Sequence, residues 1–260
     1  MSDRDGGDLA AALAAAHANA SAVDPAALGG SGPPATLAEG YRVQTRLVDR
    51  LAADRGNPVG YKIGFTNERV RADLAVGEPG YGRLLGGTVR DATAVDGPVS
   101  VASEEFVGLR IEPEIAFRLG GDLPSDADRD RARDAVATVH PAIELVDSRT
   151  GWEFDAPLAV ADNCLDAGLV LGDGTDPDGL PLGEESVTLR IDGERVDSGV
   201  GADVLGHPLA ALAWLADAVD GLPAGALVST GSLTAPRSVA PGETATATFA
   251  SLGRVGLRVR

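Results

Sequence analysis

Two acidic residues interrupt an apolar, β-branched run at positions 111–117, which reads Ile-Glu-Pro-Glu-Ile-Ala-Phe. Side chains two apart on a strand point to the same face, so Glu112 and Glu114 are expected to lie side by side. Two carboxylates a few ångströms apart repel each other, and a shared proton or a bound cation relieves the repulsion. The pair therefore indicates a metal or proton-binding site, unless both acids lie on the solvent face of an edge strand.

A third acid, Glu144, lies in a second apolar run at 141–146. Three oxygen donors without a nearby His or Cys suit a hard divalent ion such as Mg²⁺ or Mn²⁺, with positions left open for water or substrate. Acids in two separate strand-like runs favour this metal site over the solvent-face alternative. We therefore predict that Glu112, Glu114 and Glu144 are metal ligands.

Lys62 is the only lysine of the chain, and the other 21 of the 22 lysine and arginine residues are arginines. Arginine does not release its proton in a protein, whereas a desolvated lysine can act as an acid or a base near neutral pH. Lys62 lies inside a strand-like run at 59–65, where burial is expected to lower its pKa. We predict a catalytic role, and the alternative is the chance retention of one surface lysine.

The composition is strongly acidic, with 39 acidic and 22 basic residues and a formal net charge of −17. This excess argues against nucleic acids and anionic membranes as partners. The acids are spread along the chain, which predicts a halophilic surface adapted to high salt. A single cysteine excludes an intramolecular disulfide, and neither a signal segment nor a long apolar run is evident, so we expect a cytoplasmic protein.

The elements divide the chain into two regions. Helical patterns at 8–18 and after the capping box of Thr36 and Glu39 predict a helical N-terminal region at 1–57 without a core of its own. The remaining residues, 58–260, are expected to form one catalytic domain of the α+β class. A Gly-rich segment at 75–85 reads as a loop that is either a mobile wall of the site or a plain surface connection.

Four further features belong to the expected catalytic domain. Asp128 is expected to cap a helix that continues to about residue 139 and is ended by Pro141. Asp192-Gly193 predicts a hairpin, and His207 precedes a helix in a position typical of a capping residue. The last two strand patterns, 243–249 and 253–259, are expected to close the sheet.

Several polar residues are candidates for roles around the three acids. Arg149 could bind a substrate carboxylate, although a structural ion pair is the commoner role of such a residue. Asp162 and Asn163 could be second-shell partners of the metal or its water, or they could form a turn. The turn that contains Ser232 and Thr234 offers N–H groups and hydroxyls to a carboxylate.

The ordered set of motifs resembles the 2-keto-4-pentenoate hydratase and 4-oxalocrotonate decarboxylase branch of the fumarylacetoacetate hydrolase superfamily. The matching motifs lie at 60–64, 112–114, 144–149, 161–163, 205–208 and 230–234. The resemblance implies a fumarylacetoacetate-hydrolase-like, mixed and rolled β-sheet, and a divalent ion held by the three glutamates. It also implies a homo-oligomer that acts on a small-molecule substrate in the degradation of aromatic ring-cleavage products. Relatives often carry an acid where this chain has Gly77, and Glu78 is the candidate to replace it.

The resemblance and the residues together favour a hydratase. It would add water to a 2-hydroxy-2,4-dienoate and yield a 4-hydroxy-2-oxo acid, with Lys62 moving the proton. The first alternative is a decarboxylase of the 4-oxalocrotonate type, and the second is a non-catalytic, metal-stabilised oligomer in which Lys62 would be exposed. A C–C hydrolase is disfavoured because such enzymes need a base that activates water, usually a His-Glu pair, and the Ala-rich segment around His17 shows no such arrangement.

Overall fold

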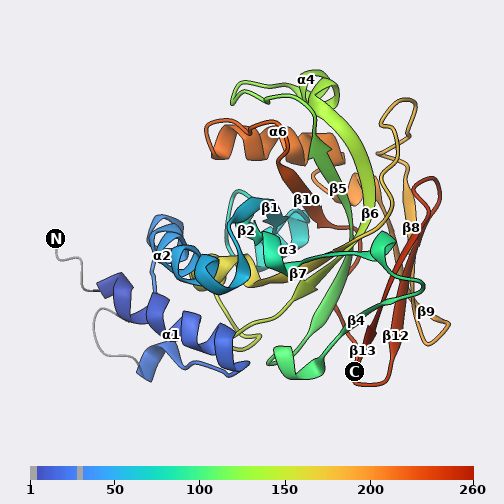
Figure 1. Ribbon diagram of the computed structural model, residues 1–260. Coiled ribbons are helices and arrows are strands. Elements are labelled where there is room, and N and C mark those ends of the chain that lie inside the picture. The colour runs from blue at the N-terminus through green and yellow to red at the C-terminus, as the bar shows by residue number, and fades with distance from the viewer. Residues whose placement is uncertain (1–4, 28–31) are drawn as a thin grey trace.

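The computed structural model describes residues 5–27 and 32–260, and it arranges the strands in two sheets (Figure 1). The larger sheet has the order β2-β1-β10-β5-β6-β7-β3, with β11 paired to β5. Its strands are β1 (Pro58–Gly64), β2 (Gly80–Leu85), β3 (Val89–Asp91), β5 (Arg110–Leu119), β6 (Val136–Val146), β7 (Asp166–Leu171), β10 (Leu227–Ser232) and β11 (Arg237–Ser238). The strands β5 and β6 therefore lie in the interior of the sheet.

The smaller sheet has the order β4-β13-β12-β8-β9 and lies against the larger one (Figure 1). Its strands are β4 (Val99–Val101), β8 (Ser186–Ile191), β9 (Glu194–Val200), β12 (Thr244–Phe249) and β13 (Arg254–Val259). The hairpin across Asp192 and Gly193 is confirmed, with φ of 48° and 84° at its two turn residues. The sequence predicted that the last two strands close the main sheet. This prediction is wrong, because both strands belong to the second, smaller sheet.

A single apolar core fills the space between the two sheets. It joins residues of both sheets, such as Ile143 and Phe117 with Leu189 and Leu257, and it includes the buried face of α6 (Pro208–Ala218). His207 caps α6, because its Nδ1 accepts the N–H of Leu209 at 3.1 Å. The capping role predicted for this histidine is thus confirmed.

The N-terminal helices α1 (Asp5–Asn19) and α2 (Leu37–Arg55) pack together at one side of the larger sheet, and a short 3-10 helix, Pro25–Ala27, lies between them in the chain (Figure 1). The hydroxyl of Thr36 accepts the N–H of Glu39, which confirms the predicted cap of α2. Their apolar cluster also contains Leu85 and Leu158 from the rest of the chain. The helical region accordingly shares its core with the larger sheet, while the boundary at 57/58 stays a prediction. Residues 1–4 and 28–31 of that region lie outside the described residues.

The predicted loop at 75–85 is only half right. Residues 80–85 form β2, which pairs with β1 along its whole length, and the short helix α3 (Glu68–Asp73) precedes the remaining loop. The glycines that suggested a loop instead permit close packing. At Gly82 in β2, for instance, a Cβ atom would lie 2.2 Å from the carbonyl oxygen of Asn163.

The helix predicted to run to residue 139 is shorter, because α4 (Arg129–Ala135) ends where β6 begins at Val136. Asp128 caps it, with its side chain accepting the N–H of Arg131 at 2.9 Å. The β-branched residues after Ala135 pair with β5, and this tertiary pairing overrides the local helical pattern. Pro141 consequently lies inside a strand and not at the end of a helix.

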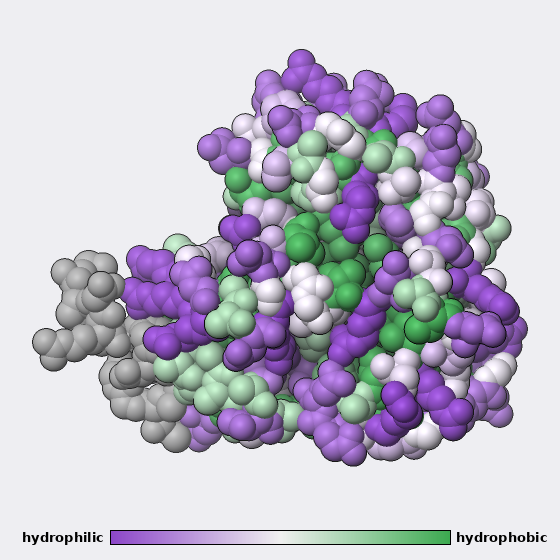
Figure 2. Space-filling view, viewed as in Figure 1, coloured by the Kyte–Doolittle hydropathy of each residue, from purple (hydrophilic) through white to green (hydrophobic). Residues whose placement is uncertain are grey.

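The remaining short elements connect these strands. They are α5 (Ala156–Ala161) and the 3-10 helices Gly86–Thr88, Ala92–Ala94, Ser103–Glu105, η5 (Asn163–Leu165) and Gly201–Asp203. Figure 2 shows hydrophilic residues over most of the face seen in Figure 1, with hydrophobic side chains visible near its centre. None of the helices in the described part of the chain combines the length and apolar character that a bilayer-spanning segment needs.

A buried polar cluster ties α1 to the strands. The Nε2 atom of His17 lies 3.0 Å from Asp162 Oδ1, and the Nε of Arg149 donates to the same carboxylate at 3.0 Å. Arg55 of α2 donates to the carbonyl oxygen of His17 at 2.6 Å. Burial, together with the positive charge of Arg149, lowers the pKa of His17 to about 4, although Asp162 acts in the opposite direction.

This cluster predicts a specific loss of stability in mild acid. The folded protein holds His17 neutral down to about pH 4, whereas the unfolded chain protonates it near pH 6.5, so stability falls as the pH decreases between these values. The free energy of unfolding should lose about 3 kcal/mol through His17 as the pH falls from about 6.5 to about 4. We expect His17→Gln to flatten the pH dependence of the free energy of unfolding, measured by urea denaturation from pH 7 to pH 4.

The control is His207→Asn, which removes a second histidine but keeps a side chain able to cap α6. It should change the slope much less than His17→Gln does. An unchanged slope in His17→Gln would contradict the assignment of this acid sensitivity to the cluster.

Candidate metal and catalytic site

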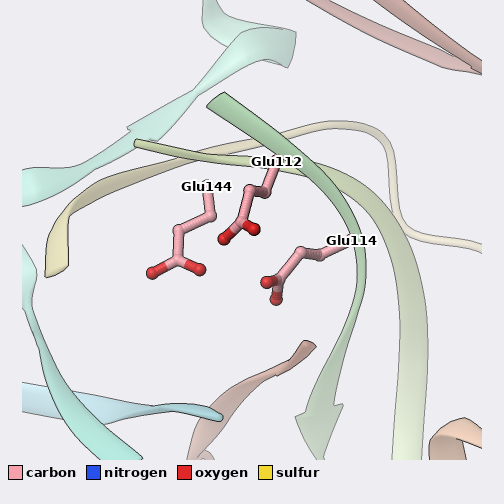
Figure 3. A group of neighbouring side chains, drawn as sticks. All are labelled: Glu112, Glu114 and Glu144. Atoms are coloured by element: carbon pink, nitrogen blue, oxygen red, sulfur yellow. The ribbon is translucent and has the colours of Figure 1, made fainter. Parts of the chain in front are cut away.

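The three glutamates converge on one point inside the larger sheet. Glu112 on β5 lies directly opposite Glu144 on β6, and Glu114 follows two residues later on the same face. Their carboxylates turn toward one another, and one oxygen of each lies within 4.8 Å of the others (Figure 3). Glu114 and Glu144 are 0% exposed, and Glu112 is half-buried. Since both strands are interior, the alternative of a solvent-facing edge strand is excluded.

The electrostatics of this cluster fit a divalent cation. Burial raises the pKa of Glu112 to about 8, assisted by the negative charge of Glu144, and burial likewise raises the pKa values of Glu114 and Glu144. Both oxygens of Glu144 and Oε1 of Glu114 are buried without a well-aligned hydrogen bond from any described residue. Buried carboxylate oxygens with unused lone pairs are the ligands that Mg²⁺ and Mn²⁺ prefer.

The strand β10 fixes one of these carboxylates. The hydroxyl of Ser229 donates to Glu114 Oε2 at 2.5 Å, and the N–H of Gly231 donates to the same oxygen at 3.0 Å. Gly231 has a φ of 110°, a conformation that only glycine adopts without strain, and this turns its N–H toward the carboxylate. The sequence analysis did not identify Ser229, whose only signal is its place in a strand that neighbours β5.

Lys62 lies beside the glutamates and is only 3% exposed. Its Nζ is 2.9 Å from Glu144 Oε1, an ion-pair distance, and it donates a hydrogen bond to the carbonyl oxygen of Cys164 at 2.9 Å. Burial lowers the pKa of Lys62, as predicted, but the negative charges led by Glu144 outweigh burial and raise the pKa above its usual value. The prediction of a lowered pKa is therefore wrong, since the glutamates stabilise the ammonium form.

The carbonyl group that receives Lys62 belongs to an unusual segment. The three residues of η5 have φ values of 52°, 54° and 63°, so that three successive non-glycine residues are left-handed. Asp162 holds the beginning of this segment through Arg149 and His17. Asn163 holds it through both backbone polar groups of Arg83 on β2. Among the described residues, no hydrogen bond or ion pair joins Asp162 or Asn163 to the three glutamates, and both side chains instead hold the segment that contains Cys164.

A fourth acid, Asp166, was missed by the sequence analysis. It is 3% exposed at the start of β7, and burial raises its pKa to about 6 while the positive charge of Lys62 acts in the opposite direction. Its Oδ1 has no hydrogen-bond partner among the described residues. The negative charge of Asp166 also raises the pKa of Glu144, so Asp166 belongs to the same group of interacting charges.

Arg149 lies in a structural ion pair, the second of the two alternatives that the sequence offered for it. It is 2% exposed, and its guanidinium contacts Asp162 at 3.0 Å, Asp147 at 3.8 Å and the carbonyl oxygens of Asp162 and Asp166. These contacts use its donors inside the protein. The structural ion pair, which the sequence analysis left open, is the arrangement found.

A cavity of about 920 Å³ opens next to the glutamates. Lys62, Glu112, Ser232 and Thr234 line it. The Ser232 hydroxyl donates to the carbonyl oxygen of Thr234 at 2.7 Å, and the N–H groups of Gly231 and Leu233 already bond to Glu114 and Pro113. The backbone of this turn is thus largely occupied, and carboxylate binding by its two hydroxyls stays a prediction.

Glu78 is not brought to this cavity. It is exposed in the loop before β2, and its electrostatic effect falls on Tyr41. Gly77 beside it is exposed, with open space around its Cα. The idea that Glu78 replaces a missing acid is therefore not supported by its position, because it does not line the cavity.

Comparison with known proteins agrees with this geometry. The family model of the fumarylacetoacetate (FAA) hydrolase C-terminal domain matches residues 84–260, and the chain belongs to this family. It is 33% identical to 4-oxalocrotonate decarboxylase of Pseudomonas putida over 236 residues, which are 87% of this chain and 86% of that protein. It is 38% identical to 2-keto-4-pentenoate hydratase of Paraburkholderia phymatum over 232 residues, 85% of this chain and 84% of that protein.

A solved structure extends the likeness to the whole chain. The 4-oxalocrotonate decarboxylase of Pseudomonas putida G7, complexed with magnesium and adipate, superposes with a TM-score of 0.89 at 28% identity, and the match covers 100% of this chain and 99% of that one. The predicted fold class, α+β with a fumarylacetoacetate-hydrolase-like mixed sheet, and the predicted family are confirmed.

The geometry of the glutamates predicts that metal binding stabilises the fold. With Mg²⁺ or Mn²⁺ at a hundredfold excess over its Kd, the free energy of unfolding should increase by about 2.7 kcal/mol, because the ion binds only the folded protein. We expect Glu112→Gln to weaken metal binding at least roughly tenfold and to lose at least about half of this gain at the same ion concentration, as measured by calorimetric titration and urea denaturation. Glu194→Gln, on the exposed hairpin, removes the same charge and should keep the full gain. Equal stabilisation of both variants would exclude Glu112 as a ligand.

Proposed function

We propose that the protein is a divalent-metal-dependent hydratase that adds water to a 2-hydroxy-2,4-dienoate. The observation that carries this proposal is the convergence of three carboxylates and the only lysine of the chain, beside a cavity that Glu112 and Lys62 line. Hydratases of such dienoates are among the relatives, and a metal-bound relative shares the fold. In this proposal Glu112, Glu114 and Glu144 hold Mg²⁺ or Mn²⁺.

The chemistry divides between the ion and the chain. A bound divalent ion would act as a Lewis acid toward the 2-oxygen and the carboxylate of the substrate. Lys62, held as an ammonium by Glu144, donates a proton to the terminal diene carbon, and its amine takes up the proton that the 2-hydroxyl releases, which gives a 2-oxo-3-alkenoate. The oxygen of water then bonds to carbon 4 and a proton is added at carbon 3, which yields the 4-hydroxy-2-oxo acid.

The remaining residues have supporting roles in this proposal. The carbonyl oxygen of Cys164 and Glu144 orient the Lys62 amine from two sides, at 2.9 Å each. To bind the substrate carboxylate, the hydroxyls of Ser232 and Thr234 at the wall of the cavity would exchange their bonds to the carbonyl oxygens of Thr234 and Ala235, at 2.7 and 3.2 Å, for bonds to the substrate. A non-catalytic, metal-stabilised oligomer is disfavoured, because it predicts an exposed lysine and Lys62 is buried.

The role of Lys62 is tested by Lys62→Arg, which keeps the positive charge but cannot release a proton. Turnover of 2-hydroxypenta-2,4-dienoate, followed by the loss of dienoate absorbance, should fall by roughly 10²- to 10⁴-fold. Metal binding should persist, which separates a loss of proton transfer from a loss of the site. Because the larger side chain could disturb a buried position, Lys62→Met serves as a second variant. Unchanged turnover in both would refute the assignment.

A decarboxylase of the 4-oxalocrotonate type is the second candidate. It is favoured by the match of the whole chain to a structure of that enzyme. The two activities differ in product, so we expect a dienoate without a second carboxylate to give a 4-hydroxy-2-oxo acid, detected by mass spectrometry. Release of CO₂ from a dicarboxylic substrate, with no hydrated product from either substrate, would instead identify the decarboxylase.

We further propose a cytoplasmic homo-oligomer with a surface adapted to high salt. The net charge of −17 supports the salt adaptation, because screening at molar salt removes the self-repulsion of such a surface. Light scattering coupled to gel filtration, at low and at molar KCl, measures both the subunit number and its dependence on salt. A monomer under both conditions would refute the oligomer.

A further inference from the structure

The cavity beside the glutamates has a second polar end. Arg110 precedes Glu112 by two residues on β5, so both side chains emerge on the same face of the strand, roughly 7 Å apart along it. Arg110 lines the cavity together with Trp152 and Phe154. A molecule bound at the glutamates and extended along the strand therefore reaches a guanidinium group.

Arg110 is held in place without using its own donors. Its Cζ lies 3.7 Å from the centroid of the Trp152 ring, so the guanidinium stacks on the indole and its N–H edges stay available. Its backbone pairs with Val146 on β6 and with Ser238 on β11, which fixes the Cα position from both sides. The indole ring in turn contacts Phe154, with 6.4 Å between ring centroids.

The guanidinium of Arg110 lacks an acidic partner in a protein that is rich in acids. Acidic residues outnumber basic ones by 39 to 22, yet Arg110 forms no ion pair and no side-chain hydrogen bond with any residue in 5–27 or 32–260. Its charge lowers the pKa of Glu112 against the larger effects of burial and of Glu144, without contact between the two side chains. A half-buried arginine with free donors beside a cavity is suited to an anionic ligand.

The other arginines of the cavity are less suited to this role. Arg237 donates Nε and Nη2 to Asp197 at 3.0 and 2.7 Å, so its charge is already neutralised. Arg69 is exposed to solvent on α3. Arg110 alone among these three is both half-buried and without an acidic partner.

We propose that Arg110 binds a second carboxylate and that the substrate is a dicarboxylate, namely a 2-hydroxy-2,4-dienoate that carries a carboxylate at the end opposite its 2-hydroxy acid group. A carboxylate accepts two parallel N–H bonds from a guanidinium, which fixes both its position and its plane. Ile63, Val146 and Leu165 line the cavity and offer apolar contact to the carbon chain between the two ends. This inference rests on the proposed function only for the binding of the first carboxylate at the glutamates.

The test measures binding without turnover. We compare 2-oxoadipate with 2-oxohexanoate, which have the same chain length and differ in the terminal carboxylate, by calorimetric titration of the Mg²⁺-loaded protein. The unmodified protein should bind 2-oxoadipate about 10- to 100-fold more tightly, the range expected for a charged hydrogen-bonded pair. Arg110→Gln should abolish this preference, and Arg110→Lys, which keeps the charge but not the paired donors, should retain part of it.

The matched control is Arg118→Gln on the same strand. Arg118 is also half-buried, but it donates to the carbonyl oxygen of Gly225 at 3.3 Å and does not line the cavity, so its loss should leave the preference unchanged. Equal affinities of the two acids for the unmodified protein, or a preference that survives in both Arg110 variants, would overturn the proposal.

The outcome is separable from that of the proposed function. If the protein prefers 2-oxoadipate through Arg110 but adds no water to any dienoate, the result supports the proposed Arg110 subsite and refutes the proposed hydratase activity. If the protein hydrates dienoates but binds the two acids equally, the result refutes the proposed Arg110 subsite and supports the proposed hydratase activity.

Discussion

The structure depends on the confinement of negative charge in the interior of a sheet. Three glutamates occupy neighbouring positions on β5 and β6, and two of them are 0% exposed. Desolvation and mutual repulsion disfavour three ionised carboxylates at this place, so the fold has to supply compensation. It does so with the ammonium of Lys62 and with donors from β10, and Oε1 of Glu114 and Oε2 of Glu144 remain without a partner among the described residues and are available to an added cation.

The same charge cluster sets the properties of its neighbours. Lys62 was expected to be a weak base because of burial, and burial does act in that direction, but the carboxylates reverse the result. The pKa of a buried group depends on which charges the fold brings near it, and these glutamates lie 50, 52 and 82 residues from Lys62 along the chain. A local sequence pattern could identify Lys62 but could not predict the sign of its pKa shift.

Much of the site was predictable because its residues are signalled by local conflicts. Acids in apolar strands and a single lysine among arginines stand out in the sequence, and the structure brings these residues together. The roles of Arg149, Asp162 and Asn163 depended on contacts with His17 and Arg83, which no spacing reveals. In the fold, α4 was predicted too long because the pairing of residues 136–139 with β5 is a tertiary effect.

The hydrogen bond that orients Lys62 comes from a main-chain carbonyl group, and this frees the side chain of Cys164 from any chemical requirement. What constrains that side chain is volume, because a Cβ atom at Gly64 would lie 2.8 Å from its Sγ. Positions 64 and 164 therefore form a steric pair: a residue with a Cβ atom at 64 is compatible with the fold only if the side chain at 164 becomes smaller than cysteine, whereas the glycine at 64 cannot become smaller to admit a bulkier residue at 164. Drift at these two positions during evolution should be coupled, while the direction of the amine stays the same.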